Sequence, residues 1–117
     1  MNKVLVCGGR DYNNYKHITE ILDRNRALEP ISHIIHGGAA GADTLAGLWA
    51  TKNGIQEVIC PANWDVHKHS AGYLRNKAML ALNPDLVIAF PGHNGTKMMV
   101  KIARVSGIKV IDFNEKT

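Results

Sequence analysis

The chain has 117 residues, a length that suits a single domain over 1–117 with a hydrophobic core of its own. Apolar residues make up 45% and charged residues 21% of the sequence, values near the globular average, which excludes wholesale disorder. No apolar run approaches the roughly 18 residues of a membrane-spanning helix, and the first run is too short for a secretory signal. We therefore expect no membrane partner.

The formal net charge of +4 and the isoelectric point of about 9.2 permit an anionic partner without naming one. Lysine and arginine are scattered, and the two Trp, three Tyr and two Phe do not alternate with them. Composition therefore gives no support for nucleic-acid binding. Cys7 and Cys60 form neither a disulfide framework nor a CxxC zinc pair, which is typical of the reducing cytoplasm, where we expect this protein.

Short apolar runs alternate along the chain with longer stretches of helical spacing. The runs expected to form strands are 3–7, 32–36, 55–60, 85–90 and 108–113. The stretches expected to form helices are 15–28, 42–53, 71–82 and 95–106. In the helix 71–82, the spacing of Ala71, Leu74, Ala78 and Leu82 predicts an apolar stripe, while Trp49 falls on the apolar face of helix 42–53.

Near-continuous apolar strands joined by helices predict a parallel sheet covered on both faces. Right-handed crossovers then favour an α/β fold, a Rossmann-like three-layer α/β/α sandwich with a five-stranded parallel sheet in the order 3-2-1-4-5. This order places the ends of the first and fourth strands side by side at a topological switch point, where open α/β sheets bind ligands.

Three of the first four predicted strands end in turns that contain glycine. These turns are Gly8-Gly9-Arg10-Asp11, Gly37-Gly38-Ala39-Ala40-Gly41-Ala42-Asp43 and Pro91-Gly92-His93-Asn94-Gly95-Thr96. Glycine lets a ligand approach the backbone, and the second and third turns lead into helix starts, which bind phosphate or carboxylate. Any α/β protein needs some glycine here, but three such turns on one rim predict a nucleotide-like anion. Neither a Walker loop nor GxGxxG is present.

Six motifs occur in order along the chain. They are Gly8-Gly9-Arg10-Asp11-Tyr12, His36 through Asp43, Pro61-Ala62-Asn63-Trp64, Arg75-Asn76, Ile88 through Gly92, and Gly95-Thr96. Taken together, they resemble the YspA-like branch of the SLOG superfamily, which also contains the DNA-processing protein DprA and the LOG-type phosphoribohydrolases. It covers essentially the whole chain. It implies a Rossmann-like domain that binds nucleotides or nucleotide-derived ligands.

The turns and the resemblance together give the expected ligand-binding residues. They are Gly8, Gly9, Arg10, Asp11, Gly37, Gly38, Ala39, Gly41, Ala42, Asp43, Trp64, Arg75, Asn76, Pro91, Gly92, Gly95 and Thr96. No cofactor is expected. No metal is expected either, because His67 and His69 have no third ligand in register.

Several of these residues have both a structural and a functional interpretation. Arg10 is either one half of a surface pair with Asp11 or a bidentate phosphate ligand, and we favour the ligand. Asp43 either complements the helix dipole or bonds a ribose hydroxyl or a positioned water. Asp11 and Asp43 are the candidate catalytic carboxylates, although a lone Asp11 is weak evidence for a general base. Thr96 can cap its helix and also donate to a phosphate.

The polar segment 62–70 is expected to fold over the same rim as a lid, with Trp64 either packing beneath it or stacking on a base. Arg75 and Asn76 follow in the next helix. Cys7 lies near the proposed ligand, but we interpret it as a buried strand cysteine rather than a nucleophile.

One departure from the LOG pattern bears on catalysis. LOG enzymes carry Pro-Gly-Gly-x-Gly-Thr followed by glutamates that serve hydrolysis, whereas this chain has Met98 and Met99 at those positions. A thioether is not a base, so LOG-style hydrolysis by these two residues is excluded.

Three functions remain open at this point. The first is a nucleotide-binding sensor, carrier or sequestering module for an ADP-ribose-like or NMP-like ligand. The alternatives are a hydrolase of an N-glycosidic or phosphoribosyl bond and a DprA-like binder of single-stranded nucleic acid, for which the sequence shows no basic stripe. Because LOG-type relatives commonly dimerise and a small sheet leaves faces to cover, we expect a homo-oligomer. The base, the number of phosphates, turnover and the pathway are not given by the sequence.

Overall fold

The computed structural model describes residues 1–62 and 70–114, in which five strands alternate with four helices. The strands are β1 (Asn2–Cys7), β2 (Ile31–His36), β3 (Gln56–Ile59), β4 (Leu86–Ala89) and β5 (Lys109–Asp112). The helices are α1 (Tyr15–Leu28), α2 (Ala42–Lys52), α4 (Ala71–Leu80) and α5 (Asn94–Val105). None of the helices in these two ranges is long and apolar enough to cross a membrane.

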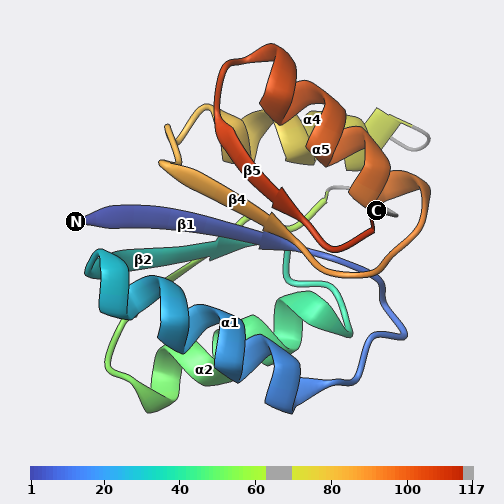
Figure 1. The fold of residues 1–117 in the computed structure, drawn as a ribbon. Coiled ribbons are helices and arrows are strands. Elements are labelled where there is room, and N and C mark those ends of the chain that lie inside the picture. The colour runs from blue at the N-terminus through green and yellow to red at the C-terminus, as the bar shows by residue number, and fades with distance from the viewer. Residues whose placement is uncertain (63–69, 115–117) are drawn as a thin grey trace.

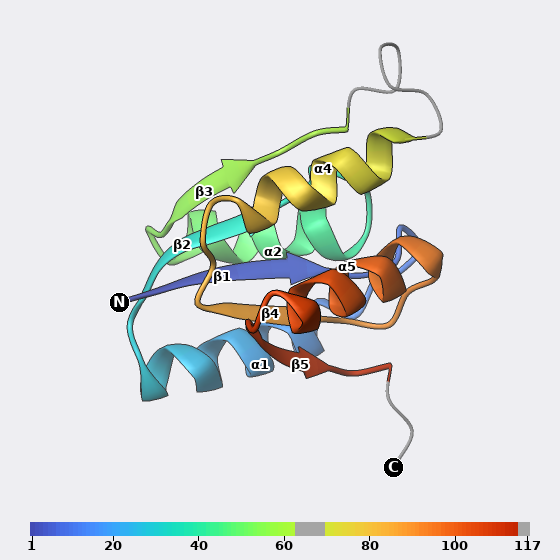
Figure 2. The ribbon, with the colours of Figure 1, turned by 90° about the horizontal axis from the view of Figure 1, so that it is seen from above.

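The strands form one parallel sheet in the order β3-β2-β1-β4-β5, which confirms the predicted Rossmann-like α/β fold. Helices α1 and α2 cover one face, and α4 and α5 cover the other (Figure 1). Figure 2 shows β1 between β2 and β4, with the five strands running in the same direction. Strands β1 and β4 are in register up to Cys7 and Ala89, so the turns that follow them begin side by side.

Two hydrophobic clusters hold these three layers together. Along β1, Val4 and Val6 join the cluster beneath α1 and α2, while Leu5 and Cys7 join the cluster beneath α4 and α5. Alternate side chains of a strand point to opposite faces, so a sheet covered on both sides requires an unbroken apolar run. Trp49 belongs to the first cluster and is 1% exposed, which confirms that it is a core residue.

The predicted apolar stripe of the third helix is wrong except at Ala71. Helix α4 ends at Leu80, and Leu74 and Leu82 are 39% and 37% exposed. The buried residues of α4 are instead Ala71, Asn76 and Met79. The physical reason lies in Asn76, which is buried because its amide forms hydrogen bonds, a possibility that a pattern of apolar residues does not anticipate.

Candidate functional site

The turns after β1, β2 and β4 lie against one another at the carboxyl ends of the strands. The Gly9 amide donates to the Pro91 carbonyl at 2.8 Å, and the Ala42 amide donates to the Gly9 carbonyl at 3.2 Å. A Cβ on Gly8 would lie 2.6 Å from the Cβ of Ala42. The three turns therefore share one rim, and their glycines allow this close packing.

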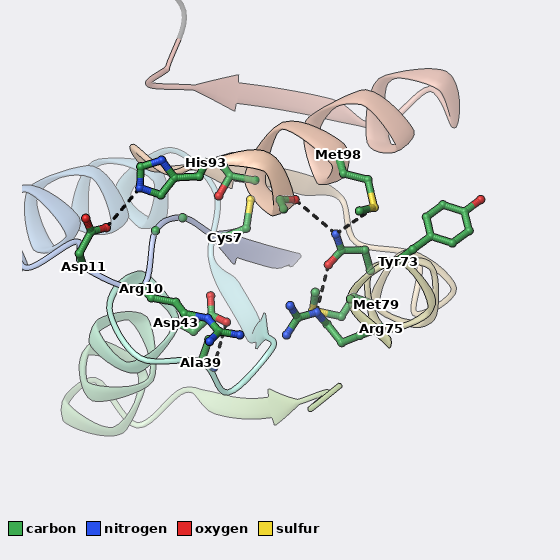
Figure 3. A pocket seen from close by; sticks show the side chains of 16 residues that line it. Cys7, Arg10, Asp11, Ala39, Asp43, Tyr73, Arg75, Met79, His93 and Met98 are labelled. Atoms are coloured by element: carbon green, nitrogen blue, oxygen red, sulfur yellow. Dashed lines mark hydrogen bonds and ion pairs between the residues drawn. The ribbon is translucent and has the colours of Figure 1, made fainter. Parts of the chain in front are cut away.

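A cavity of about 520 Å³ opens beside these turns, between α4 and the start of α5 (Figure 3). Ten of the residues expected at the site line it. They are Gly8, Gly9, Arg10, Asp11, Ala39, Asp43, Arg75, Asn76, Gly95 and Thr96. The cavity lies at the switch point between β1 and β4, where the strand order predicts ligand binding.

Six other expected residues lie in or beside the turns without lining the cavity. They are Gly37, Gly38, Gly41, Ala42, Pro91 and Gly92. Some of them make contacts between the turns, such as Gly41, which has a φ of +80° and no room for a Cβ beside Gly9. Gly37 instead bonds Asp43 and Arg75, and Gly38 bonds His36. Trp64, with the proposed lid and the His67 and His69 pair, lies outside the described residues.

Six of the cavity residues are not among the expected ligand-binding residues, although Cys7 is predicted near the ligand and His93 lies in the third predicted turn. They are Cys7, Gly72, Tyr73, Met79, His93 and Met98. One signal was available, because residues three or four positions from Arg75 and Asn76 share their face of a helix, and Gly72 and Met79 have that spacing.

The Asp43 carboxyl group lies at the cavity and is only 6% exposed. Its Oδ2 accepts hydrogen bonds from the amides of Gly37 at 3.1 Å and Ala39 at 3.2 Å. These two backbone amides therefore donate to Asp43 rather than to a ligand. Burial raises the pKa of Asp43, and this effect outweighs the opposing influence of the Ala39 and Gly37 amides and of Arg75.

Arg75 reaches the cavity from α4 in a fixed orientation. Its Nη1 donates to the Gly37 carbonyl at 3.1 Å, and its Nε donates to Asn76 Oδ1 at 3.1 Å. Asn76 is 4% exposed and donates through Nδ2 to the Gly95 carbonyl at 3.4 Å. The guanidinium is therefore held by the second turn on one side and by α5, through Asn76, on the other.

Arg10 is the second cation at the cavity and differs from Arg75 in being exposed. Among residues 1–62 and 70–114 it has no hydrogen bond or ion pair. Its neighbour Asp11 lies 3.8 Å from His93 Nε2 instead (Figure 3). The surface pair of Arg10 with Asp11 is therefore not formed, and the Arg10 side chain is available to a ligand.

Cys7 borders the cavity without the properties of a nucleophile. Burial raises the pKa of its thiol, and the carboxylates of Asp43 and Asp112 raise it further. Its Sγ lies 3.9 Å from the Ile88 carbonyl oxygen. The interpretation of Cys7 as a buried strand cysteine is confirmed.

A histidine beneath the second turn fixes the shape of that turn. His36 is 3% exposed, and its Nδ1 accepts the Gly38 amide at 2.9 Å. The proton therefore belongs on Nε2, which lies 2.7 Å from Glu57 Oε2 and donates to it. Sequence reasoning missed this chain of contacts, because His36 and Glu57 lie on different strands.

The N-termini of α2 and α5 differ in whether they can bind a ligand in the cavity. Neither α2 nor α5 begins with a side-chain cap, so Thr96 does not act as one. Ala42, at the start of α2, has its amide bound to Gly9. Gly95 and Thr96 at the start of α5 line the cavity, which places the positive end of the α5 dipole beside it.

Metal binding was not expected, and the part of the chain described here offers no group of three or more His, Cys, Asp or Glu side chains placed to hold a metal ion. Because His67 and His69 lie outside that part, the expectation that no metal binds stays a prediction.

Solved structures show what the fold is similar to. DNA processing protein A (DprA) from Streptococcus pneumoniae matches with a TM-score of 0.76 at 19% identity, over 96% of this chain and 50% of DprA. This chain thus spans about half the length of DprA. The Moco carrier protein from Chlamydomonas reinhardtii matches with a TM-score of 0.62 at 14% identity, over 99% of this chain and 78% of that protein. Both likenesses show a shared fold.

Sequence comparisons are more specific. The gene 61 protein of Mycobacterium phage D29 is 33% identical over 124 residues, which cover 99% of this chain and 99% of the phage protein. A model of the YspA, cpYpsA-related SLOG family matches residues 2–67, more than half of the chain. The chain belongs to the YspA, cpYpsA-related SLOG family.

Proposed function

We propose that this protein binds a nucleotide or a nucleotide-derived ligand in the cavity, as a carrier, sensor or sequestering module. The observation that carries the proposal is that two arginines, Arg10 and Arg75, border one cavity at the switch point of the sheet. Arginine matches the geometry of a phosphate through paired N–H donors.

The size and electrostatics of the cavity support a small anionic ligand. About 520 Å³ lies within the usual range of small-molecule sites. The start of α5, where Gly95 and Thr96 line the cavity, adds the partial positive charge of a helix N-terminus. Since Arg10 has no partner in the described part of the chain, binding a phosphate breaks no existing ion pair of this residue.

The chemistry of the cavity favours binding over hydrolysis. Met98 stands where the LOG enzymes have a glutamate, and the Cys7 thiol has a raised pKa. Asp43 is the better placed of the two candidate catalytic carboxylates, but Gly37 and Ala39 already occupy one of its oxygens. The name of the Moco carrier protein also agrees with a carrier role.

A DprA-like role in binding single-stranded nucleic acid is the second candidate, favoured by the likeness in fold to DprA. The scattered lysines and arginines argue against it. A gel shift with single-stranded DNA across a salt series tests it, because binding through phosphates weakens steeply as salt rises.

The test of the main proposal is incubation with a panel of mononucleotides, NAD and ADP-ribose. Melting temperature reports binding, and mass spectrometry reports whether the ligand is changed. A ligand that raises the melting temperature and is recovered intact is the expected result. A released base would favour the hydrolase. If no member of the panel binds, the result would contradict both the binding module and the hydrolase.

Self-association and a cytoplasmic location complete the proposal. Exposed apolar side chains on and just after α4, namely Tyr73, Leu74 and Leu82, support contact with a second copy. Light scattering on the purified chain tests this, with a mass above that of one chain as the expected result. A cytoplasmic location stays a prediction from cysteine usage.

A further inference from the structure

The two oxygens of Asp43 have different surroundings. Oδ2 accepts the amides of Gly37 and Ala39. Oδ1 accepts no hydrogen bond from residues 1–62 or 70–114. It is also not among the fully buried side-chain atoms that lack a partner, and Asp43 lines the cavity. One oxygen of a carboxyl group that is 6% exposed is thus left for a ligand.

The chemistry of Asp43 Oδ1 determines which ligand group can lie against it. A carboxylate accepts hydrogen bonds and repels a phosphate, so the partner must be a donor such as a hydroxyl group. A hydroxyl group that donates to this carboxylate oxygen makes a charge-assisted hydrogen bond, which is stronger than a hydrogen bond between neutral groups. These charges favour a phosphate toward Arg10 and a hydroxyl group against Asp43.

Arg75 offers the complementary atom nearby. Gly37 links the two side chains, because its amide donates to Asp43 and its carbonyl accepts from Arg75 Nη1. With Nη1 and Nε engaged, Nη2 of Arg75 has no partner among the described residues. In Figure 3, Asp43 and Arg75 lie along one side of the cavity, and His93 and Met98 lie along the other.

We propose that Asp43 and Arg75 together recognise a sugar hydroxyl, and that the ligand is a ribonucleotide rather than a 2′-deoxyribonucleotide. A hydroxyl group can donate to Asp43 Oδ1 while it accepts from Arg75 Nη2. The two neighbouring hydroxyls of a ribose suit such an acceptor and donor. This inference rests on the proposed function and adds the part of the ligand that the site discriminates.

The experiment compares equilibrium affinities of the four ribonucleoside 5′-monophosphates with those of their 2′-deoxy and 3′-deoxy forms. Loss of the recognised hydroxyl is expected to weaken binding about tenfold to a hundredfold, as for a lost hydrogen bond to a charged group. The ratio is measured on the unaltered protein, so it does not depend on whether a variant folds.

Two variants assign the effect to Asp43. Asp43→Asn keeps an oxygen for the Gly37 and Ala39 amides and presents an amide donor to the cavity, so the ribose preference is expected to fall to about threefold or less. Glu20→Gln removes a carboxylate from α1, away from the cavity, and is expected to keep the preference. Circular dichroism tests whether both variants are folded.

Each outcome separates the sugar recognition from the proposed function. Equal affinity for the ribo and deoxy forms would overturn the sugar recognition and leave the proposed function standing. A ribose preference that persists in Asp43→Asn would remove Asp43 from this role. If no nucleotide binds at all, the proposed function fails, and the sugar recognition fails with it.

Discussion

Gly41 lies against Gly9 so closely that a Cβ on Gly41 would overlap the Gly9 carbonyl oxygen. The same carbonyl accepts the Ala42 amide at 3.2 Å, so the turn after β1 and the start of α2 are joined through backbone atoms. Gly41 also has a φ of +80°, which residues other than glycine rarely adopt. This position thus combines two separate requirements for glycine.

Gly41→Ala should lower the free energy of unfolding by at least about 3 kcal/mol, because backbone strain adds to a clash with backbone atoms that cannot rotate away. Urea denaturation followed by circular dichroism measures the change. A loss below about 1 kcal/mol would show that the two turns separate easily.

Substitutions at two other glycines separate the cost of backbone strain from the cost of the steric clash. Gly54 has a φ of +66°, and a Cβ added there would have nothing within 4 Å, so Gly54→Ala should cost only the strain, about 1–2 kcal/mol. Gly95 has neither a positive φ nor a neighbour within 4 Å of an added Cβ, so Gly95→Ala in α5 should be neutral or stabilising by up to about 1 kcal/mol. The expected order of cost is Gly41, then Gly54, then Gly95.

The contact between His36 and Glu57 predicts a second stability effect. Glu57→Ala should destabilise the fold by about 1–3 kcal/mol, because it leaves the buried His36 Nε2–H without its acceptor. Gln56→Ala, at an exposed position on the same strand, is the matched control and should change stability by less than about 0.5 kcal/mol. Equal effects of the two variants would mean that the His36 contact contributes nothing specific.

The raised pKa of Asp43 predicts how stability depends on pH. Because the folded state holds this proton more tightly than the unfolded state, the contribution of Asp43 falls as pH rises from the ordinary value of 3.8 through the raised value. Asp43→Asn removes this titration. The variant should therefore gain stability relative to the unaltered protein as pH increases toward neutral.

Urea midpoints of both proteins across the acidic to neutral range measure this difference. A difference that stays constant with pH would contradict the raised pKa. A stability difference that shifts in favour of Asp43→Asn as pH rises, together with a loss of ribose preference, is the pattern expected of a functional residue whose burial is costly.

The two arginines should respond differently to removal. Arg10→Ala should weaken binding of a phosphorylated ligand by about 1.5–3 kcal/mol and leave stability unchanged, because Arg10 has no partner within the described ranges. Arg75→Ala should reduce both the affinity for the ligand and the stability of the fold, since it also removes the hydrogen bonds to Gly37 and Asn76. Calorimetric titration and urea denaturation measure the two quantities.

Arg24→Ala provides the control for net charge, because Arg24 is exposed on α1, away from the cavity. Its affinity should match that of the unaltered protein. If Arg24→Ala weakened binding as much as Arg10→Ala, the effect would come from the overall charge, and Arg10 would not be a ligand.

The sheet was predictable from sequence because its information is local. The central strands β1 and β4 are apolar runs, and the alternation of strands and helices leaves few right-handed arrangements. The α4 stripe failed for a non-local reason. Asn76 is buried because Arg75 and Gly95 satisfy its amide group, and Gly95 is distant in sequence. A helix with apolar residues on more than one face gives no unique inward side.

The site was predictable in outline for a similar reason. The strand order places the turns together, so Arg10 and Asp43 could be assigned to the same rim. What the sequence does not reveal is how each glycine is used. Gly41 and Gly92 allow the turns to pack on Gly9, whereas Gly95 borders the cavity. Packing between turns and contact with the cavity both require glycine, so the two roles look the same in the sequence.

The most direct measurement is a crystal structure of the protein with a bound ribonucleoside 5′-monophosphate. We expect the phosphate beside Arg10, with a ribose hydroxyl within hydrogen-bond distance of Asp43 Oδ1 and Arg75 Nη2. A nucleotide seated outside the cavity, or inside it with its phosphate against Asp43, would contradict both the proposed binding site and the sugar recognition.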